Sequence, residues 1–448
     1  MESELDAEIL CAGKEIYDFA GELFPICRSI TGEGTRETLR LIKNKINEHT
    51  GRDLTICEVP SNSTVFDWTV PKEWCIRDGY IENESHEKII DFKKNNLHIL
   101  GYSTPVDEWV DLEELKKHIY TEPSQPEAIP YVTSYYKERF GFCMSENMLK
   151  SLKDGKYHMF IDSELFEGSL SYGELIIKGN TDKEVLISTY VCHPSMANNE
   201  CSGPALSTWL IKYIDSLSKS SKGLKYTYRF VFIPETIGSI TYLSKNLPVM
   251  KEKTIAGFNL SCVGDNRTYS IVHSRYANTY ADKVLNNVLK FVADFKSYSF
   301  LNRGSDERQY NAPGVDLPVV TYCRSKYCEY PEYHTSLDTM DLVSQEGFAG
   351  SYNVMTQVIN VLENNTICKM KVLCEPQLGK RGLYPSISRK GTYDAVKSLT
   401  DFIAYADGRN DLIDISEIIN VPVSELIPIK DKLYDNDLIS REDISCVR

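Results

Sequence analysis

Apolar and polar positions alternate in two different ways in the central part of the chain, from Glu174 to about Leu373. Five short apolar runs have the length and composition of buried strands: Val185–Cys192, Tyr226–Ile233, Thr254–Cys262, Thr268–His273 and Leu317–Tyr322. Four segments with apolar residues three and four positions apart predict helices: Pro204–Leu217, Ile237–Lys245, Asn278–Val292 and Gln345–Leu362. Strands that alternate with helices favour an α/β fold with a doubly wound, mostly parallel sheet.

Two further helices are expected before this region, over residues 3–24 and 35–49, because their apolar residues also follow a helical period. From about Pro60 to Gly168 the amino-acid composition and the periodicity of the apolar residues change. This part contains three of the four Trp residues, many Tyr and Pro residues and short β-like runs, and helical spacing occurs only near Leu112–Ile119. These features predict a separate, mainly β domain.

The last part of the chain predicts short helices followed by a β wing, which is the order of a winged helix. The helices are expected over Gly391–Ala406, Ile413–Ile419 and Ser424–Asp435, and the wing begins at Asp437-Leu-Ile439. The expected domains are an α/β domain of residues 1–59 and 169–375, an inserted β domain of residues 60–168, and a winged helix of residues 383–448.

The charge of the chain argues against nucleic acid as a partner. The 448 residues include 50 Lys and Arg against 64 Asp and Glu, a formal charge of −14. A surface this acidic repels phosphate backbones. From Leu383 to Arg448 there are eight Lys and Arg against twelve Asp and Glu, whereas DNA-binding winged helices present a basic face. We therefore expect this domain to pack on its neighbours or to mediate dimers or partner contacts, so a homo-oligomer remains open.

The cysteines and the N-terminus indicate a soluble, cytoplasmic protein. The 13 Cys residues are scattered and form no Cys-x-x-Cys pair, which fits a reducing compartment better than a disulfide framework. The acidic start MESELDAEIL lacks the features of a secretory signal. No stretch approaches the roughly 20 apolar residues of a membrane helix, so we expect no membrane partner.

Polar residues follow the ends of the expected strands. His193, Glu235, Asp265 and His334 each come after a different strand, and ligands of open α/β sheets bind at the carboxyl ends of the strands. Two imidazoles beside carboxylates are what a hydrolytic metal site needs. Asp265 is most simply a turn residue. The thiol of Cys192 is expected to pack in the core, since adjacent strand residues point to opposite faces.

The α/β part resembles the zinc-dependent aminopeptidases that use two co-catalytic metals. The stretch Tyr333-His-Thr-Ser-Leu-Asp-Thr339 matches the last motif of that family. His193 matches its first metal ligand, and Glu235-Thr-Ile-Gly238 matches the motif whose first Glu is the general base. Ser305-Asp-Glu-Arg308 resembles a Ser-Asp-His stretch of the family.

The whole chain is also similar to a bacterial group of aminopeptidase-like proteins with an inserted β domain and a C-terminal winged helix. Four segments carry this resemblance: Phe24-Pro-Ile-Cys-Arg-Ser-Ile-Thr31, Asp67-Trp-Thr-Val-Pro71, Asn96-Leu-His-Ile-Leu-Gly-Tyr-Ser-Thr-Pro105 and Ile129-Pro-Tyr-Val-Thr-Ser-Tyr-Tyr136. The resemblance covers nearly all 448 residues.

The chain departs from the two-metal pattern at several of its carboxylate positions. The family's bridging Asp falls at Asn199, its second Glu at Thr236, and the aspartate of its Asn-Leu-Asp motif at Ser261. A neutral amide cannot hold two dications against their mutual repulsion as a shared carboxylate can. We therefore expect one divalent metal, best matched by zinc, held by His193, His334 and Asn199, with Glu200, Glu235 or water completing the shell.

The resemblance implies a hydrolase that cleaves an amide bond of a small peptide or another amino-bearing substrate. Glu235 would act as the base, and the insert would roof the crevice. Four loop residues, Arg303, Arg308, Arg324 and Lys326, lie in the same loops as the site, where Arg and Lys often bind carboxylates but loop charges are usually solvated. Of these we select Arg324 and Lys326 as substrate contacts, together with Asp306. Asn199, Thr236 and Ser261 equally suit a catalytically degenerate protein that binds a ligand or partner. A transcriptional regulator is disfavoured by the acidic winged helix.

Overall fold

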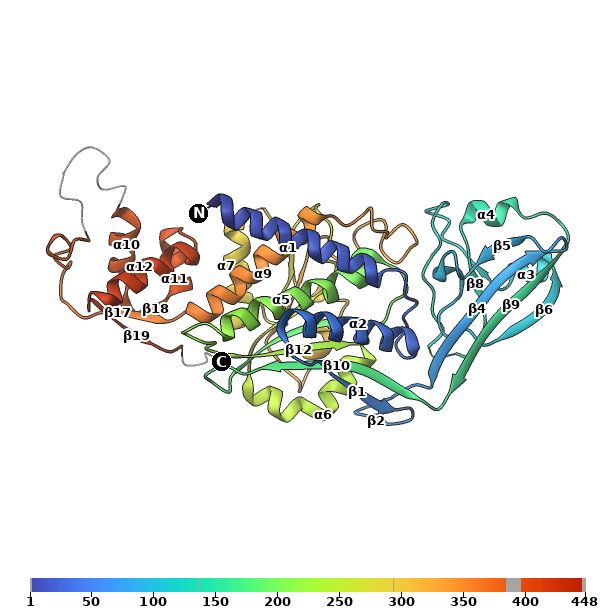
Figure 1. Cartoon of the computed structure of the whole chain (residues 1–448), viewed down its shortest axis with the longest axis horizontal. Coiled ribbons are helices and arrows are strands. Elements are labelled where there is room, and N and C mark those ends of the chain that lie inside the picture. Colours follow the sequence, from blue (N-terminus) through green and yellow to red (C-terminus); the bar gives the residue numbers. More distant parts are fainter. Residues whose placement is uncertain (1, 136, 293, 384–395, 445–448) are drawn as a thin grey trace.

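The computed structural model describes residues 2–135, 137–292, 294–383 and 396–444, and side chains from Ala7 on. Three units follow one another along its longest axis, with the C-terminal helices at one end, the large sheet in the middle and a smaller β unit at the other end (Figure 1).

The central sheet has eight strands in the order β1-β10-β12-β11-β13-β16-β14-β15. Its strands are β1 (Thr55–Pro60), β10 (Ser169–Ile177), β11 (Glu184–Tyr190), β12 (Thr227–Ile233), β13 (Thr254–Leu260), β14 (Ser270–Val272), β15 (Lys296–Tyr298) and β16 (Val319–Cys323). The four central strands β12, β11, β13 and β16 are parallel to one another. The pairs β1–β10, β10–β12 and β14–β16 are antiparallel, whereas β14 and β15 pair in parallel. The expected mostly parallel α/β sheet is therefore confirmed.

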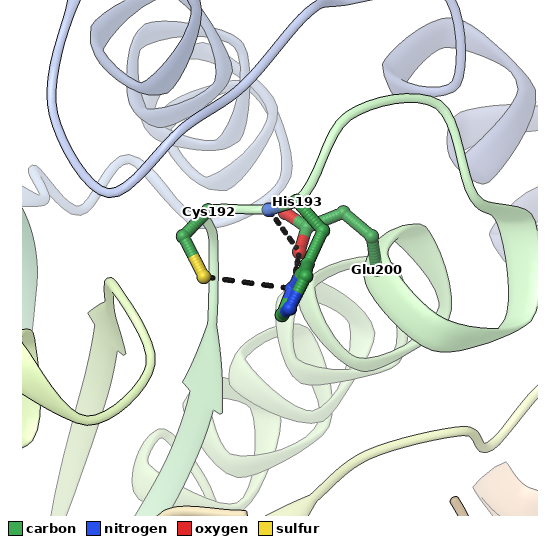
Figure 2. Close-up of side chains that lie close together, drawn as sticks. All are labelled: Cys192, His193 and Glu200. Carbon is green, nitrogen blue, oxygen red and sulfur yellow. Dashed lines mark hydrogen bonds and ion pairs between the residues drawn. The ribbon is translucent and has the colours of Figure 1, made fainter. Parts of the chain in front are cut away.

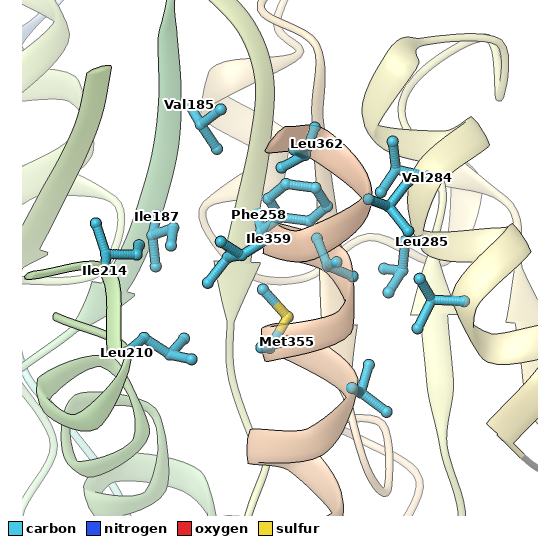
Figure 3. Packing of buried hydrophobic residues seen from close by; sticks show 14 of the residues in the cluster. Val185, Ile187, Leu210, Ile214, Phe258, Val284, Leu285, Met355, Ile359 and Leu362 are labelled. Carbon is cyan, nitrogen blue, oxygen red and sulfur yellow. The ribbon is translucent and has the colours of Figure 1, made fainter. Parts of the chain in front are cut away.

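Helices cover both faces of this sheet. They are α1 (Glu2–Leu23), α2 (Glu33–Thr50), α5 (Ser202–Ser218), α6 (Ile237–Lys253), α7 (Tyr280–Val292), α8 (Glu307–Tyr310) and α9 (Gln345–Asn364). Val185 and Ile187 of β11 belong to one apolar cluster with α5 and α9, whereas Leu186 belongs to a second cluster with α6. Figure 3 shows the first cluster, in which Met355 and Leu210 extend from α9 and α5 towards the strands. Burial on both faces is what a central parallel strand requires.

Most expected helices are found with their ends shifted by only a few residues. The exception is α6, which continues through Pro248 to Lys253 instead of ending at Lys245. Met250 in its last turns is fully buried against the second apolar cluster, and this packing stabilises the extension.

The inserted unit is mainly β, as expected. Its main sheet has the order β5-β4-β9-β6. Its elements are β2 (Thr64–Val65), β3 (Trp68–Thr69), β4 (Glu73–Asn83), β5 (Lys88–Asp91), η1 (Asn96–His98), β6 (Val106–Asp111), α3 (Leu112–Lys116), β7 (Ile119–Tyr120), β8 (Phe142–Cys143), α4 (Glu146–Ser151) and β9 (Lys156–Phe166). The helix α4 was not expected; Ser145 caps it by accepting a hydrogen bond from Met148 N.

Two segments of the chain join the insert to the central sheet, and they are paired with each other by hydrogen bonds. The β1–β10 ladder ends at the pair Pro60–Ser169, and the β4–β9 ladder begins at the pair Glu73–Phe166. Between them, Ser61 N donates to the Gly168 carbonyl at 2.9 Å. The connection is therefore a two-stranded ribbon, one strand of which is interrupted by the β2–β3 hairpin, rather than a pair of loose linkers.

The C-terminal unit is a winged helix, as expected. Its elements are β17 (Ile367–Met370), η4 (Gly379–Arg381), α10 (Lys397–Tyr405), β18 (Asp407–Asp411), α11 (Leu412–Ile419), α12 (Val423–Asp435) and β19 (Ile439–Glu442), and its sheet has the order β18-β17-β19. The strand β17 precedes the expected start of this domain at residue 383, and residues 391–395 of the expected first helix lie outside the described residues. Asn287 Nδ2 of α7 donates to Glu417 Oε1 of α11 at 2.6 Å, so the unit packs on its neighbour.

None of the helices in the described part of the chain is both long and apolar enough to cross a bilayer.

Candidate active site

A cavity of about 660 Å³ lies at the carboxyl ends of the parallel strands. His193 follows β11, Glu235 follows β12, and His334 lies in the loop after β16. The cavity is lined by Ile30, Asn62, Trp68, Thr69, Val70, Pro71, Tyr131, Thr133, Tyr135, Cys192, His193, Glu235, Thr236, Ile237, Arg308, Gln309 and His334. Eight of these 17 residues belong to the insert, which therefore forms one side of the cavity.

The structure brings the two expected histidines together. The ring centroids of His193 and His334 are 5.3 Å apart, with 44° between the ring planes. His334 Nε2 is buried and has no hydrogen-bond partner within the described residues. Burial lowers the pKa of His334 well below its usual value, and the neighbouring His193 lowers it further, so the ring is neutral at pH 7.

His334 has an unusual backbone conformation. Its φ angle is +56°, in the left-handed region that few non-glycine residues adopt, and such residues cluster at functional sites. The insert holds this conformation in place, since Tyr131 N donates to the His334 carbonyl at 2.9 Å. The Tyr131 ring also lies edge-on to both histidines, with centroid distances of 5.1 and 5.4 Å.

A buried carboxylate orients His193. Glu200 Oε2 lies 3.1 Å from His193 Nδ1 and accepts a hydrogen bond from the His193 backbone N at 2.9 Å, as Figure 2 shows. Burial lowers the pKa of His193, but the hydrogen bond to Glu200 and the charge of Glu235 more than compensate, and the net effect is a raised pKa. With Nδ1 engaged by Glu200, Nε2 is the ring atom left for a ligand.

Sequence reasoning missed the residue that anchors Glu200. Arg28 is fully buried, its Nε lies 3.0 Å from Glu200 Oε1, and the same N–H donates to the His193 carbonyl at 2.9 Å. Arg28 belongs to the segment Phe24–Thr31 that carries the family resemblance, and this was the only signal of its role in the sequence. The N-terminal segment is thus part of the site.

Cys192, His193 and Glu200 form the one group of three His, Cys, Asp or Glu ligand atoms within 4.8 Å found in the described parts of the chain. This group is better explained as a hydrogen-bonded network, because Arg28 already neutralises Glu200. Burial and the charge of Glu200 raise the pKa of the Cys192 thiol well above its usual value. The thiol packs in an apolar cluster as expected, but it also lines the cavity and accepts a hydrogen bond from Glu235 N at 3.2 Å.

Glu235 is the one carboxylate among the described residues that line the cavity. Its Oε2 lies 3.8 Å from His193 Nε2. Burial raises the pKa of Glu235, and the charges of His193 and Arg308 oppose this increase only in part. The next residue, Thr236, has a φ angle of +65°, so the chain turns sharply between β12 and α6 at this point.

Asp306 lies behind the cavity wall rather than in it. Its Oδ1 accepts hydrogen bonds from Thr236 N and Ser239 Oγ, both at 2.8 Å, while its buried Oδ2 has no partner in the described chain. Burial and the negative charge of Glu235 raise the pKa of Asp306 to about 7. The structure therefore gives Asp306 the role of ordering the start of α6, in place of the expected substrate contact.

Asn199 is buried beside the site but does not line the cavity. Its Nδ2 donates to the Tyr190 hydroxyl at 3.0 Å, whereas its Oδ1 has no hydrogen-bond partner among the described residues. The oxygen that the sequence-based hypothesis assigns to a metal is thus unengaged. Ser261, at a position where the resemblance expects an aspartate, instead shares a hydrogen bond of 2.8 Å with the Tyr190 hydroxyl.

The structure does not bring Arg324 and Lys326 to the cavity. Arg324 is buried, and its guanidinium donates to the Thr268 carbonyl at 2.7 Å and to Asn266 Oδ1 at 2.8 Å. Lys326 is also buried, and its ammonium donates to the Tyr327 carbonyl at 3.0 Å. Both cations tie the loop after β16 to its surroundings, which corrects the expectation that they contact substrate.

Two further buried carboxylates hold loops. Asp265 accepts hydrogen bonds from the N–H and hydroxyl of Ser325, at 2.9 and 2.8 Å. Asp338 accepts from the backbone N of Asn198 at 2.6 Å and of Asn199 at 2.9 Å, and burial raises its pKa to about 6. These bonds fix the segment that carries Asn199.

Comparisons with known proteins agree with this architecture. Residues 17–365 match a family described as a domain of unknown function, DUF4910, and residues 366–441 match a winged helix-turn-helix family. A Clostridium acetobutylicum protein named "Putative polysaccharide biosynthesis protein with aminopeptidase-like domain" is 42% identical over 435 residues, 95% of this chain and 96% of that protein. The crystal structure of a "putative peptidase" from C. acetobutylicum has a TM-score of 0.90 at 40% identity and covers 98% of this chain and 99% of its own.

More distant solved structures share the fold. BSAP, a zinc aminopeptidase from Bacillus subtilis, has 13% identity and a TM-score of 0.54, covering 78% of this chain and 94% of its own. A peptidase M28 precursor from Shewanella amazonensis has 15% identity and a TM-score of 0.55, covering 84% of this chain and 99% of its own. The chain therefore belongs to the DUF4910 family and joins an aminopeptidase-like α/β domain to a C-terminal winged helix.

Proposed function

We propose that the protein is a metal-dependent, aminopeptidase-like hydrolase that cleaves an amide bond of a small peptide or another amino-bearing substrate. The observation that carries this proposal is the pairing of His193 and His334 at a cavity that Glu235 also lines. The aminopeptidase-like name of the Clostridium relative supports the same class of reaction.

The side chains of the site fit one divalent ion. Two imidazoles bound to a tetrahedral zinc at about 2.0–2.1 Å would have ring centroids about 5 Å apart, and the observed distance is 5.3 Å. The unpartnered His334 Nε2 and Asn199 Oδ1 are donor atoms that an ion would satisfy. Glu200 on His193 Nδ1 is the kind of outer carboxylate that metal-binding histidines usually have. We propose zinc as the ion, because imidazole and oxygen donors suit it.

The residues of the chain supply binding and proton transfer. A divalent ion in such a site supplies a Lewis acid that polarises a carbonyl and acidifies water. Glu235, whose pKa is raised by burial, accepts the proton of the attacking water and returns it to the leaving amine. Arg28 and Glu200 hold His193 in one orientation throughout.

The size of the cavity supports a small substrate. A volume of about 660 Å³ is typical of pockets for small molecules. Since the insert forms one side of it, longer chains would collide with this roof. We further propose that the protein acts in the cytoplasm, where its twelve described free thiols stay reduced.

Elemental analysis and hydrolysis assays on the full chain test the proposal. Aminoacyl amides and N-acyl amino sugars are suitable substrates. We expect about one divalent ion per chain, lost in His193→Ala and His334→Ala. Glu235→Gln should keep the ion and lose roughly 10²- to 10⁴-fold in rate. His86→Ala, an exposed histidine of the insert, is the matched control and should keep both. Retention of metal and activity by His334→Ala would refute the proposal.

A second candidate function is a binding module without catalysis. It is favoured by the neutral residues Asn199, Thr236 and Ser261, which stand where the resemblance expects carboxylates. In that case the wild-type chain contains no metal and turns over no substrate, and Asn199→Asp restores both. The same assays therefore separate the two functions.

A further inference from the structure

Arg308 is the one Lys or Arg among the described residues that line the cavity. Arg308 lies in the short helix α8. Two other arginines nearby form ion pairs: Arg275 with Asp316, and Arg229 with Glu184. Arg308, in contrast, makes no ion pair with any carboxylate of the described residues. Its charge is thus available to a ligand.

The guanidinium of Arg308 makes one hydrogen bond and has a second donor without a partner in the described chain. One Nη2 hydrogen bond to Thr236 Oγ1 fixes its position. Its Nε is buried and has no hydrogen-bond partner within the described chain. A buried donor that is left unpaired costs free energy, so part of the hydrogen-bonding capacity of this guanidinium is unused within the described chain.

The carboxylates near Arg308 do not take its free donors. Burial raises the pKa of Glu235 and Asp306, and the positive charge of Arg308 opposes part of both increases, so Arg308 lies within electrostatic reach of them. However, Asp306 Oδ1 is occupied by Thr236 N and Ser239 Oγ. Arg308 is therefore not explained as a structural counter-ion alone.

Thr236 connects Arg308 to the reacting centre. It follows Glu235 directly and stands where the resemblance expects a second glutamate. A glutamate there would neutralise the guanidinium, whereas the neutral hydroxyl only orients it. An anion bound to Arg308 would consequently lie in the same cavity as Glu235, His193 and His334.

We propose that Arg308 forms a subsite for a substrate carboxylate, so that the substrate is a small amide that keeps a free carboxylate, such as a dipeptide. This inference rests on the proposed function. One guanidinium matches one carboxylate in a bidentate pair, whereas phosphate sites usually combine several donors or a helix N-terminus. Trp68, Tyr131 and Tyr135 supply the apolar walls that a small ligand needs.

Calorimetric titration of the full chain tests this subsite without turnover. The probes are alanyl-alanine with a reduced CH₂–NH linkage, which cannot be hydrolysed, and its C-terminal amide. We expect the carboxylate form to bind about 10- to 100-fold more tightly, as expected for one charge-assisted hydrogen-bonded pair. Arg308→Gln should abolish the difference, and Arg308→Lys should reduce it.

The control is Arg303→Gln, an exposed arginine in the same region that does not line the cavity and should preserve the preference. Equal binding of the two probes by the wild-type chain, or a preference that survives Arg308→Gln, would overturn the subsite. Hydrolysis of alanyl-alanine is measured separately. A carboxylate preference without hydrolysis of alanyl-alanine, aminoacyl amides or N-acyl amino sugars refutes the hydrolase proposal and leaves the subsite standing.

Discussion

The backbone N–H of Tyr131, in the insert, donates a hydrogen bond of 2.9 Å to the carbonyl oxygen of His334, in the loop after β16. The pairing continues in one direction along the two segments, because Ser336 N donates to the Ile129 carbonyl and Ile129 N donates to Ser336 Oγ, each at 2.9 Å. The insert therefore holds the loop of one candidate metal ligand as well as covering the cavity.

Ser336→Ala should weaken metal binding through this pairing. The substitution removes the acceptor of Ile129 N and loosens the His334 loop, and loss of comparable outer contacts lowers metal affinity about 10- to 100-fold. Competition titration with a chelator measures the effect. Ser151→Ala, in α4 of the insert, removes a hydroxyl far from the loop and should leave the affinity unchanged. Equal affinities for both variants would show that the pairing has no role in metal binding.

Arg28→Met should destabilise the fold strongly. It leaves Glu200 as a buried charge without its partner, which typically costs about 3–5 kcal/mol. The double variant Arg28→Met/Glu200→Gln should recover part of this loss, since no buried charge is then unpaired. Urea unfolding of the metal-free chain measures the free energies. Lys14→Met breaks an exposed pair with Asp18 and should cause no comparable change. A small effect of Arg28→Met would contradict a buried ion pair.

Asp306 should make stability depend on pH. Its pKa rises from an ordinary value of 3.8 to about 7 in the folded chain, so folding favours the protonated form. The stability gained in this way is fully present below about pH 3.8 and is lost as the pH rises through 7. Asp306→Asn should therefore flatten the unfolding free energy between pH 4 and pH 7 in chelator.

The charge of Glu235 contributes to this shift of Asp306. In Glu235→Gln the transition attributed to Asp306 should consequently move to lower pH. Unfolding curves collected at several pH values report both effects. Parallel pH profiles for the wild type and Asp306→Asn would assign the dependence to other groups.

Cys192 should be dispensable for the reaction. The thiolate is the nucleophilic form of cysteine, and burial with the charge of Glu200 raises the pKa of this thiol well above its usual value. Cys192→Ala should therefore keep kcat/KM within a few-fold of the wild type. A loss as large as that expected for Glu235→Gln would point instead to a Cys–His mechanism.

The sequence predicted five of the eight strands of the central sheet, because period and length distinguish buried strands from amphipathic helices, but it missed β1, β10 and β15. It also predicted that His193 and His334 meet, since the carboxyl ends of parallel strands share one edge. It did not predict where loop side chains point. Arg324 and Lys326 lie in loops beside the site, yet Arg324 donates hydrogen bonds to a backbone carbonyl and to Asn266, and Lys326 donates to a backbone carbonyl.

The role of Arg28 illustrates the same limit. Arg28 and Glu200 are far apart in the chain, and no periodicity links a loop before α2 with the segment after β11. Only the packed structure determines which buried charges pair. The same holds for Tyr131, whose contact with His334 depends on how the insert folds back over the sheet.

The two-stranded ribbon between the insert and the central sheet has a consequence for selectivity. A single flexible tether would let the insert swing, whereas two hydrogen-bonded strands resist both bending and twisting. The distance between the insert and the two histidines, His193 and His334, is then set by backbone geometry. Relatives that lengthen or shorten this ribbon would accept ligands of different size while keeping every candidate site residue.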